Sequence, residues 1–244
     1  MSTMAVMSIL DDLAMTVGFQ GFVPRSLTFL SQVRQENSKE WFDAHRAEYE
    51  TTLLEPFRAL VDELGIAMLA IDDLFEIRPA IGKTLSRIHR DTRFSHDKSR
   101  YRSNMWLTFK RYRKDWTDAP TYFFELYPDG WRFGLGYYSA SRDTMTLFRQ
   151  TMRDNPERFL KVASCLGTTF DVEGERYKRP LIKDQPEALA RWYNCKSFAA
   201  IANRTDMGTA FSGELVTTLT QGFMQLAPLY HYLMHIEAMK RAAL

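Results

Sequence analysis

Two aromatic-rich segments joined by a short turn constrain the fold of this chain more than any other feature. The segments cover residues 121–127 and 131–138, and the residues between them are Pro128, Asp129 and Gly130. Aromatic residues are enriched in strands, and proline and glycine favour tight turns because of their backbone geometry. The pattern predicts an antiparallel β-hairpin.

The second segment of this hairpin carries an unusual pair of glycines. Gly134 and Gly136 fall on the same side of the strand, because side chains alternate between its two faces. Glycine inside a strand indicates a bulge or the close approach of another group. We therefore expect one face of the return strand to be bare.

Residue periodicity predicts further strands and the helices around them. Alternation predicts strands at 75–78 and 105–112, a short two-stranded excursion around 172–177, and an edge strand at 196–202. Apolar residues at helical spacing predict helices at 26–33, 38–49, 57–68, 144–152, 155–166, 186–192 and from 212 or 213 onward. Pro56 and Pro228 are expected to break or kink the helical stretches that contain them, because proline lacks a backbone N–H.

The order of these elements is helices, then strands, then mostly helices, which is typical of the α+β class. We expect an antiparallel sheet from the middle of the chain, packed on one face by N- and C-terminal helices. The second face is expected to be partly open. Residues 1–18 are predicted to be a loosely ordered lead-in, and residues 19–244 a single α+β domain.

Capping residues predict where three helices begin. Asn37 is followed three residues later by Glu40, which predicts a capping box with Asn37 as the N-cap. Asp143 and Asn155 are predicted to cap the next two helices. Pro156 suits the first turn of the latter.

Composition narrows the class and the compartment. A hydrophobic content of 45% supports a sizeable core, so a disordered chain is not expected. Cys165 and Cys195 are the only cysteines, which argues against a disulfide framework and predicts a cytoplasmic location. The first 17 residues lack a basic leader and are too short to cross a bilayer, so we expect neither a signal peptide nor a membrane partner. The oligomeric state is left open.

Charge is unevenly distributed along the chain. Residues 83–114 contain eleven basic and two acidic residues, whereas the remainder contains 21 basic and 28 acidic residues. A segregated positive region attracts anions such as phosphate or nucleic acid. The two acidic residues, Asp91 and Asp97, stand among arginines, and carboxylates hold guanidinium groups in bidentate pairs. We therefore expect an ordered basic loop that Asp91 and Asp97 hold in place.

The preferred hypothesis is that this loop binds a phosphate-bearing ligand or nucleic acid. The expected phosphate contacts come from basic residues of the loop, namely Arg87, Arg90, Arg93, Lys98 and Arg102. Tyr101, with Tyr137 or Tyr138, is expected to offer stacking faces. No cofactor is expected.

Two alternatives use the same residues differently. In the first, the chain is an enzyme that acts on a small phosphorylated or carboxylated compound, with Asp91 or His89 as acid or base and the arginines holding the anion. In the second, the chain is a structural or interaction domain whose arginines and aspartates form an internal network without a ligand. The sequence leaves all three hypotheses open.

Short catalytic motifs in the basic run match known patterns poorly. A protein-kinase catalytic loop begins His-Arg-Asp, as residues 89–91 do, but it needs an asparagine five residues after the aspartate, where this chain has His96. Ser95 and Lys98 have the spacing of the Ser-x-x-Lys motif, but its companion motifs are absent. Neither activity is therefore predicted.

Metal chemistry has no better support in the sequence. His231 and His235 would share a helix face, but the glutamate that zinc proteases place beside the first histidine is absent. Asp91, Asp97 and Glu125 are the acidic candidates for a metal nuclease near the basic run. We predict no metal site.

Several stretches together resemble one known family. The central run, Arg87-Ile88-x-Arg90-Asp91-Thr92-Arg93-Phe94-Ser95-x-Asp97-Lys98, is similar to the most distinctive segment of domain-of-unknown-function family 2461. The other matching residues are Phe22-Val23-Pro24, Leu27-x-Phe29-Leu30, Asn37-x-x-x-Trp41-Phe42, Tyr49, Pro56, Gly134-x-Gly136-Tyr137-Tyr138 and Arg149. The resemblance covers most of the chain and implies a shared fold. It implies no activity, because none is established for the family.

Overall fold

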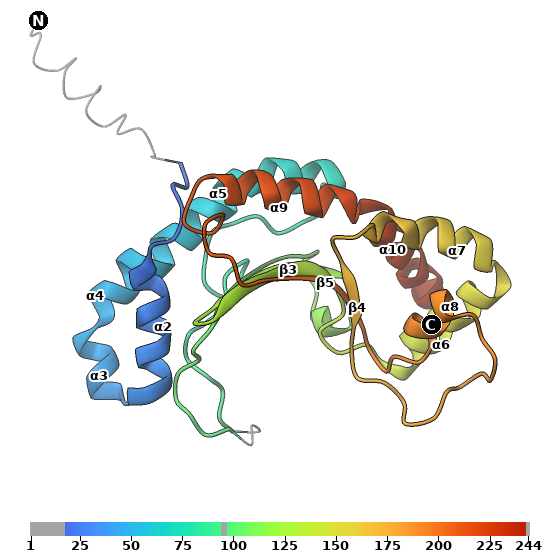
Figure 1. Ribbon diagram of the computed structural model, residues 1–244, viewed down its shortest axis with the longest axis horizontal. Coiled ribbons are helices and arrows are strands. Elements are labelled where there is room, and N and C mark those ends of the chain that lie inside the picture. The colour runs from blue at the N-terminus through green and yellow to red at the C-terminus, as the bar shows by residue number, and fades with distance from the viewer. Residues whose placement is uncertain (1–17, 94–96, 243–244) are drawn as a thin grey trace, which may run out of the picture.

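An arched β-sheet lies at the centre of the molecule, in a computed structural model that describes residues 18–93 and 97–242 (Figure 1). Helices from both ends of the chain lie on and beside this sheet, so the fold class is α+β, as predicted. The lead-in expected at residues 1–18 lies outside the described residues except for Gly18. Residues 94–96 of the basic run lie outside them as well.

Within the described ranges, five strands form one antiparallel sheet in the order β1-β2-β3-β5-β4. Their bounds are β1 (Met105–Phe109), β2 (Thr121–Tyr127), β3 (Gly130–Gly136), β4 (Asp171–Glu173) and β5 (Ala199–Arg204). The β2–β3 hairpin is confirmed, with Glu125 paired to Arg132 across it. The strand expected at an edge, β5, instead lies between β3 and β4. β4 overlaps the short excursion predicted around 172–177, and its pairing with β5 moves β5 away from the edge.

Helices before the sheet are α2 (Pro24–Glu36), α3 (Lys39–Ala44), α4 (Arg46–Tyr49), the π-helical turn η1 (Glu50–Leu54) and α5 (Glu55–Ile71). Those after β1 are the 3₁₀ turn η2 (Trp116–Asp118), α6 (Arg142–Asp154), α7 (Pro156–Ala163), the 3₁₀ turn η3 (Ser164–Leu166), α8 (Glu187–Tyr193), α9 (Glu214–Gln225) and α10 (Ala227–Ala242). None of the helices in the described ranges combines the length and apolarity needed to cross a membrane.

Both prolines that were expected to interrupt helices lie at such interruptions. The π-helical turn η1 directly precedes Pro56, which takes its place in the first turn of α5. Pro228 lies in the first turn of α10, just after the break at Leu226 that separates α9 from α10. First-turn positions suit proline because their N–H groups have no partner inside the helix.

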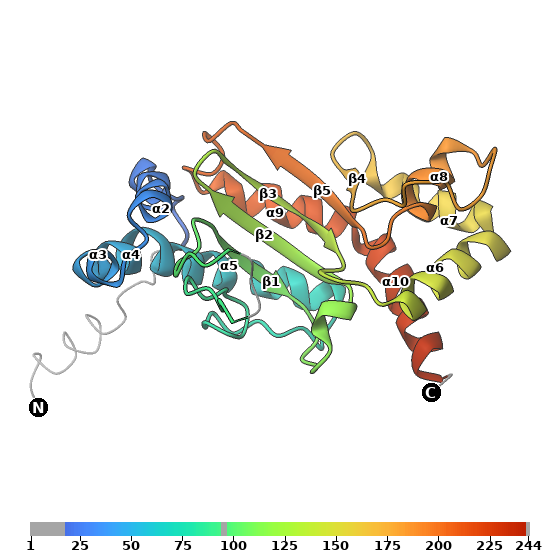
Figure 2. The same cartoon turned by 90° about the horizontal axis from the view of Figure 1, so that it is seen from below.

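One face of the sheet is covered and carries most of the aromatic core. Alternation turns Tyr122, Phe124 and Leu126 of β2 toward α5 and α9, and all three are fully buried. Phe57 of α5 lies 5.8 Å from Phe124, and Phe223 of α9 lies 5.2 Å from Tyr122, measured between ring centroids. Both helices lie across this face, whereas the opposite face has no helix in front of it in the described part of the chain (Figure 2).

The open face of the sheet lies between two groups of helices. Helices α2 to α4 stand at one end of the arch, and α6, α7, α8 and α10 stand at the other (Figure 1). The loop that carries η2 lies at the second end, below the ends of the strands (Figure 2). The predicted open second face is therefore a concave surface with protein at both ends.

Two of the three predicted helix caps were assigned to the wrong residue. Asn37 ends α2 with a φ of 22°, and Ser38 caps α3 by accepting a hydrogen bond from the backbone N–H of Trp41. Likewise, Ser141 rather than Asp143 caps α6. Asn37 does not act as N-cap because its side chain is bonded to another segment. The third prediction is confirmed, since the side chain of Asn155 caps α7.

The basic run forms a paired ladder that projects from the sheet beside β1. The backbone N–H of Arg90 donates to the carbonyl of Arg100, and that of Arg102 donates to Ile88, each at 2.8 Å. Asn37 holds the base of this ladder, because its amide donates to the carbonyl of Tyr101 and its side-chain oxygen accepts from the N–H of Tyr101, each at 2.9 Å. The described parts of the basic run, residues 87–93 and 97–102, thus pair as the two sides of a hairpin that is anchored to the N-terminal helices.

Candidate ligand-binding cleft

A cleft of about 340 Å³ lies on the open face of the sheet. Its lining comes from β1, β2, β3, β5 and the segments next to them, and includes Arg102, Trp106, Trp116, Phe123, Glu125 and Tyr138. Trp106, Phe123 and Glu125 share this face because β1 and β2 pair Trp106 with Glu125 in register. The walls therefore combine aromatic rings with a small number of charged groups, which is typical of ligand sites.

The bare face predicted for β3 lies in this cleft. A Cβ atom at Gly134 would lie 1.9 Å from the carbonyl oxygen of Ala200, and one at Gly136 would lie 2.4 Å from Cα of Ala199. The close approach that the glycines indicated is therefore that of the β5 backbone. Because no side chain can stand at these two positions, the space above them stays open.

A second hollow, of about 370 Å³, adjoins the first on the side of the basic hairpin. It is lined by Arg87, His89, Arg90 and Asp91, together with Arg102 and Trp106. The last two residues line both hollows, so the two spaces share the side chains of Arg102 and Trp106 as a common boundary. The basic run and the bare sheet face, two separate features of the sequence, thus form one surface.

Part of the basic hairpin is closed by internal pairs, as the roles expected for Asp91 and Asp97 require. Arg93 makes a bidentate pair with Asp91, at 3.0 Å from Nε and 2.8 Å from Nη2. Asp97 lies 3.0 Å from Nη2 of Arg90. The Nζ of Lys98 donates to the carbonyl of Thr92 at 2.9 Å. Each of these three basic groups therefore has a partner within the hairpin itself.

Unlike Arg90 and Arg93, Arg102 makes no ion pair with a carboxylate among the described residues. Its guanidinium lies over the ring of Trp106, 5.0 Å from the ring centroid. Its Nε is buried without a hydrogen-bond acceptor. Burial and the nearby charge of Arg90 lower the pKa of Arg102. Arg87 is exposed and also has no ion pair within the described ranges.

The two acid–base candidates differ in their environments. Hydrogen bonds from Arg93 lower the pKa of Asp91 to about 2, so this carboxyl holds no proton near neutral pH and is a weak base. Partial burial, with the charges of Arg46 and Arg100, lowers the pKa of His89. The lowered pKa favours the neutral form of His89, which lines the second hollow.

The tyrosines expected to stack with a ligand have different exposures. Tyr101 is 2% exposed, stacks on Phe42 at 4.4 Å and lines neither hollow, so its ring offers no face to a ligand. Tyr137 touches the cleft but is 5% exposed, and its hydroxyl is buried without a partner. Tyr138 is 73% exposed and stands at the cleft beside Trp116. Of the three, Tyr138 has the accessible ring.

Glu125, a nuclease candidate from the sequence, lies in the cleft and apart from the other acids. Its carboxylate accepts hydrogen bonds from Nε of Arg132, at 2.6 Å, and from the side chain of Asn104. It thus forms a polar patch that spans β2 and β3. No group of three potential metal ligands occurs within residues 18–93 and 97–242. His231 and His235 line hollows elsewhere, along α10.

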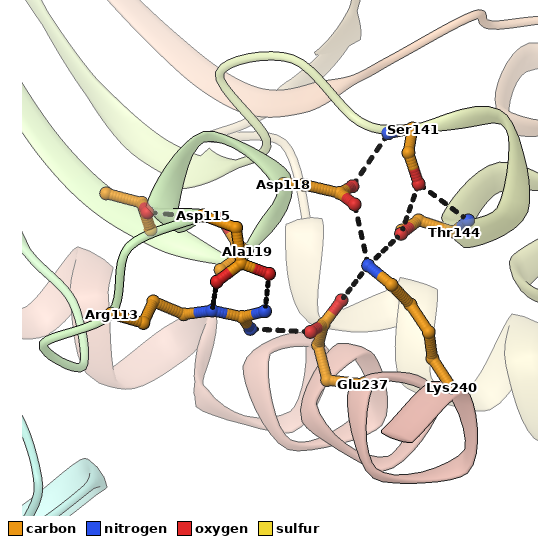
Figure 3. Close-up of polar contacts among 9 residues, drawn as sticks. Arg113, Asp115, Asp118, Ala119, Ser141, Thr144, Glu237 and Lys240 are labelled. Carbon is orange, nitrogen blue, oxygen red and sulfur yellow. Dashed lines mark hydrogen bonds and ion pairs between the residues drawn. The ribbon is translucent and has the colours of Figure 1, made fainter. Parts of the chain in front are cut away.

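A buried ionic network fixes the wall of the cleft that carries Trp116 (Figure 3). Arg113 donates to Asp115 and, at 2.7 Å, to Glu237 of α10, which is 1% exposed. Lys240, one turn further along α10, donates to Asp118 at 2.6 Å. Charges on both sides of Trp116 are thus tied to the same helix, so the loop and its tryptophan keep a fixed position.

Sequence reasoning did not single out Trp106, Trp116 or Phe123. Trp106 and Phe123 lie on the same face as Gly134, and this could be derived once the register of β1, β2 and β3 is known. Alternation within one strand does not supply that register. Trp116 comes from a 3₁₀ turn, which has no periodic signal.

Comparison with known proteins places the chain in one family. The model of the family described as "Conserved hypothetical protein (DUF2461)" matches residues 25–232. No curated protein matches the chain. The match covers most of the sequence and includes both the basic hairpin and the strands of the cleft. The chain therefore belongs to the DUF2461 family of conserved hypothetical proteins.

Proposed function

We propose that this protein binds a small phosphate-bearing compound where the two hollows meet. Arg102 and Arg87 would hold the phosphate, and the rings of Trp106 and Tyr138 would contact the rest of the ligand. One observation carries the proposal: Arg102 lines both hollows, and no carboxylate of the described residues lies within ion-pair distance of it. A guanidinium with spare donors at the edge of an apolar cleft is suited to a phosphate group.

The ion pairs made by the other basic residues of the run favour a small ligand over nucleic acid. Beyond the pairs of Arg90 and Arg93, Arg111 pairs with Asp72 and Arg113 with Glu237, so much of the positive charge of the run is compensated internally. A nucleic acid needs a row of uncompensated charges along its backbone. The cleft volume of about 340 Å³ is within the range typical of small-molecule sites.

Binding of inorganic phosphate and of a mononucleotide, followed by tryptophan fluorescence, tests this proposal. Arg102→Ala should weaken binding roughly tenfold or more, because a charge-assisted hydrogen bond contributes about 1.5–3 kcal/mol. Arg100→Ala is the matched control. It removes the same charge from the same hairpin, but Arg100 is exposed and lines neither hollow, so the dissociation constant should change less than about twofold.

The second part of the test measures binding of a labelled single-stranded oligonucleotide at two salt concentrations. Tight oligonucleotide binding with a steep loss at high salt, but no response to phosphate or mononucleotide, would replace the small ligand with nucleic acid. If neither probe binds at low salt, or if Arg102→Ala and Arg100→Ala weaken binding equally, the proposed site is wrong.

A further inference from the structure

Lys110 follows directly after β1 and continues the alternation that turns Trp106 and Thr108 toward the open face. Its Nζ donates a hydrogen bond to the hydroxyl of Thr108 at 2.7 Å. The same Nζ lies 4.7 Å from the centroid of the Trp116 ring. Thr108 and Trp116 both line the cleft and Lys110 itself does not, so the amine lies at the margin of the cleft, in contact with two of its lining side chains.

The surroundings of this amine are unusually apolar for a lysine. No carboxylate lies within ion-pair distance of it in the part of the chain that the structure describes. Glu76 is the charged group that acts on it from the neighbouring segment, and Glu76 is itself paired with Arg78. Burial outweighs the effect of Glu76 and lowers the pKa of Lys110 to about 8.

The wall above the amine is held rigidly. Trp116 belongs to the loop whose Asp115 and Asp118 are tied through Arg113 and Lys240 to α10 (Figure 3). The backbone that carries Trp116 is therefore tied to α10 on both sides of this residue. Fixed desolvation of a lysine is a recognised way to make its amine a nucleophile.

We propose that Lys110 forms a Schiff base with the carbonyl group of a phosphorylated aldehyde or ketone held in the cleft. The inference rests on the proposed function, because the phosphate would be the part held at Arg102. The amine lone pair attacks the carbonyl carbon, and the carbonyl oxygen takes the two amine protons and leaves as water. A C=N bond replaces the C=O bond, and no oxidant or reductant is consumed.

The first test measures the reactivity of the amine alone. Reductive methylation with formaldehyde and cyanoborohydride is followed by peptide mass spectrometry over a range of pH values. Near pH 7.5 the unprotonated fraction of a lysine with a pKa of about 8 exceeds that of an ordinary lysine by roughly a hundredfold. We expect Lys110 to react roughly tenfold faster than the exposed Lys114, with a rate midpoint near pH 8.

A substitution at Trp116 distinguishes the effect of the pKa of Lys110 from the effect of reagent access to its amine. Trp116→Leu opens the amine to water, so the rate midpoint should rise toward that of an ordinary lysine although access improves. If the wild-type midpoint already equals that of Lys114, or if Trp116→Leu leaves the midpoint of Lys110 unchanged, the proposal is overturned.

The second test uses glyceraldehyde 3-phosphate followed by borohydride, which fixes a Schiff base as a stable amine. The adduct should form on Lys110 in preference to Lys114 and should fall about tenfold in Arg102→Ala. Labelling that is evenly spread over exposed lysines overturns the Schiff base. The proposed function is judged separately by binding of inorganic phosphate, which involves no amine chemistry, so failure of the Schiff base can be distinguished from failure of the phosphate site.

Discussion

Asn37 shows how one side chain can connect distant parts of this protein. It ends α2 and bonds to both backbone groups of Tyr101, 64 positions later in the chain. Its amide also donates to Val33 at 2.9 Å. With a φ of 22°, it has a backbone conformation that asparagine and glycine tolerate better than other residues. Asn37 therefore determines how the basic hairpin meets the N-terminal helices.

Two substitutions of Asn37 distinguish the effect of its backbone conformation from the effect of its hydrogen bonds to Tyr101. Asn37→Gly keeps the backbone conformation but leaves the N–H and carbonyl of Tyr101 without partners, so the free energy of unfolding should fall by about 2 kcal/mol. Asn37→Ala should lose about 1 kcal/mol more, because alanine adds strain at positive φ. Urea denaturation measures both. A glycine variant as stable as the wild type would contradict the anchoring role.

Individual site residues could be predicted from sequence only in part. The pairs of Asp91 and Asp97 with arginines follow from their alternation, because oppositely charged neighbours on a short hairpin are within reach of each other. The sequence does not reveal which guanidinium is left without a partner. That depends on tertiary contacts, because the guanidinium of Arg102 lies over Trp106 and outside ion-pair distance of any described carboxylate.

Elements were predicted more reliably than their ends. The β2–β3 hairpin and the breaks near Pro56 and Pro228 follow from turn chemistry and proline geometry, which act locally. The N-cap residue is harder to predict, because several polar residues near the start of a helix are each suited to cap it. At the start of α6, Ser141 rather than Asp143 is the N-cap. Its backbone N–H is already held by Asp118, at 2.7 Å, so the chain enters the helix at that point.

Alanine substitutions at α6 test this assignment. Ser141→Ala should lower the free energy of unfolding by about 1 kcal/mol, because the N–H of Thr144 loses its acceptor. Asp143→Ala is the matched control and should cost at most about 0.5 kcal/mol, through its weaker interaction with the helix dipole. Thermal denaturation of the two variants would refute the assignment if Asp143→Ala proved the more destabilising.

Strand β3 offers a second test at the level of the element. Gly134→Ala should destabilise the protein by on the order of 3 kcal/mol, because the added methyl group would meet the backbone of Ala200. Gly208→Ala serves as the control, since the nearest atoms to its added methyl group lie at 3.5 Å or more. Equal stability of both variants in urea would mean that β5 does not approach β3 so closely.

Across the whole molecule, side chains from both ends of the chain pack into one continuous core. Tyr230 of α10 lies 5.1 Å from Phe75 and 5.4 Å from Tyr122, and its hydroxyl donates to the buried Asp72. The sequence could predict the layered arrangement, because element order and amphipathicity specify which faces are buried. It could not predict how closely the backbone of β5 approaches β3 at Gly134, because that depends on the pairing of strands far apart in the sequence.

This continuous core leads to a prediction for the single domain expected over residues 19–244. Heating should unfold the described core in one cooperative transition, with a calorimetric enthalpy equal to the van't Hoff enthalpy. Two resolved transitions in the calorimeter would instead divide the chain into separate folding units.

The outer strands of the sheet also affect how copies of this protein meet in concentrated solution. Beside β1, the segment at 84–86 bonds to Trp106 and Thr108, and on the far side β4 spans only Asp171–Glu173. Neither margin within the described ranges offers a long row of vacant amide and carbonyl groups to a neighbouring copy. Aggregation by pairing of edge strands from different copies is therefore disfavoured. This holds although the broad concave face between these margins carries no helix in the described ranges.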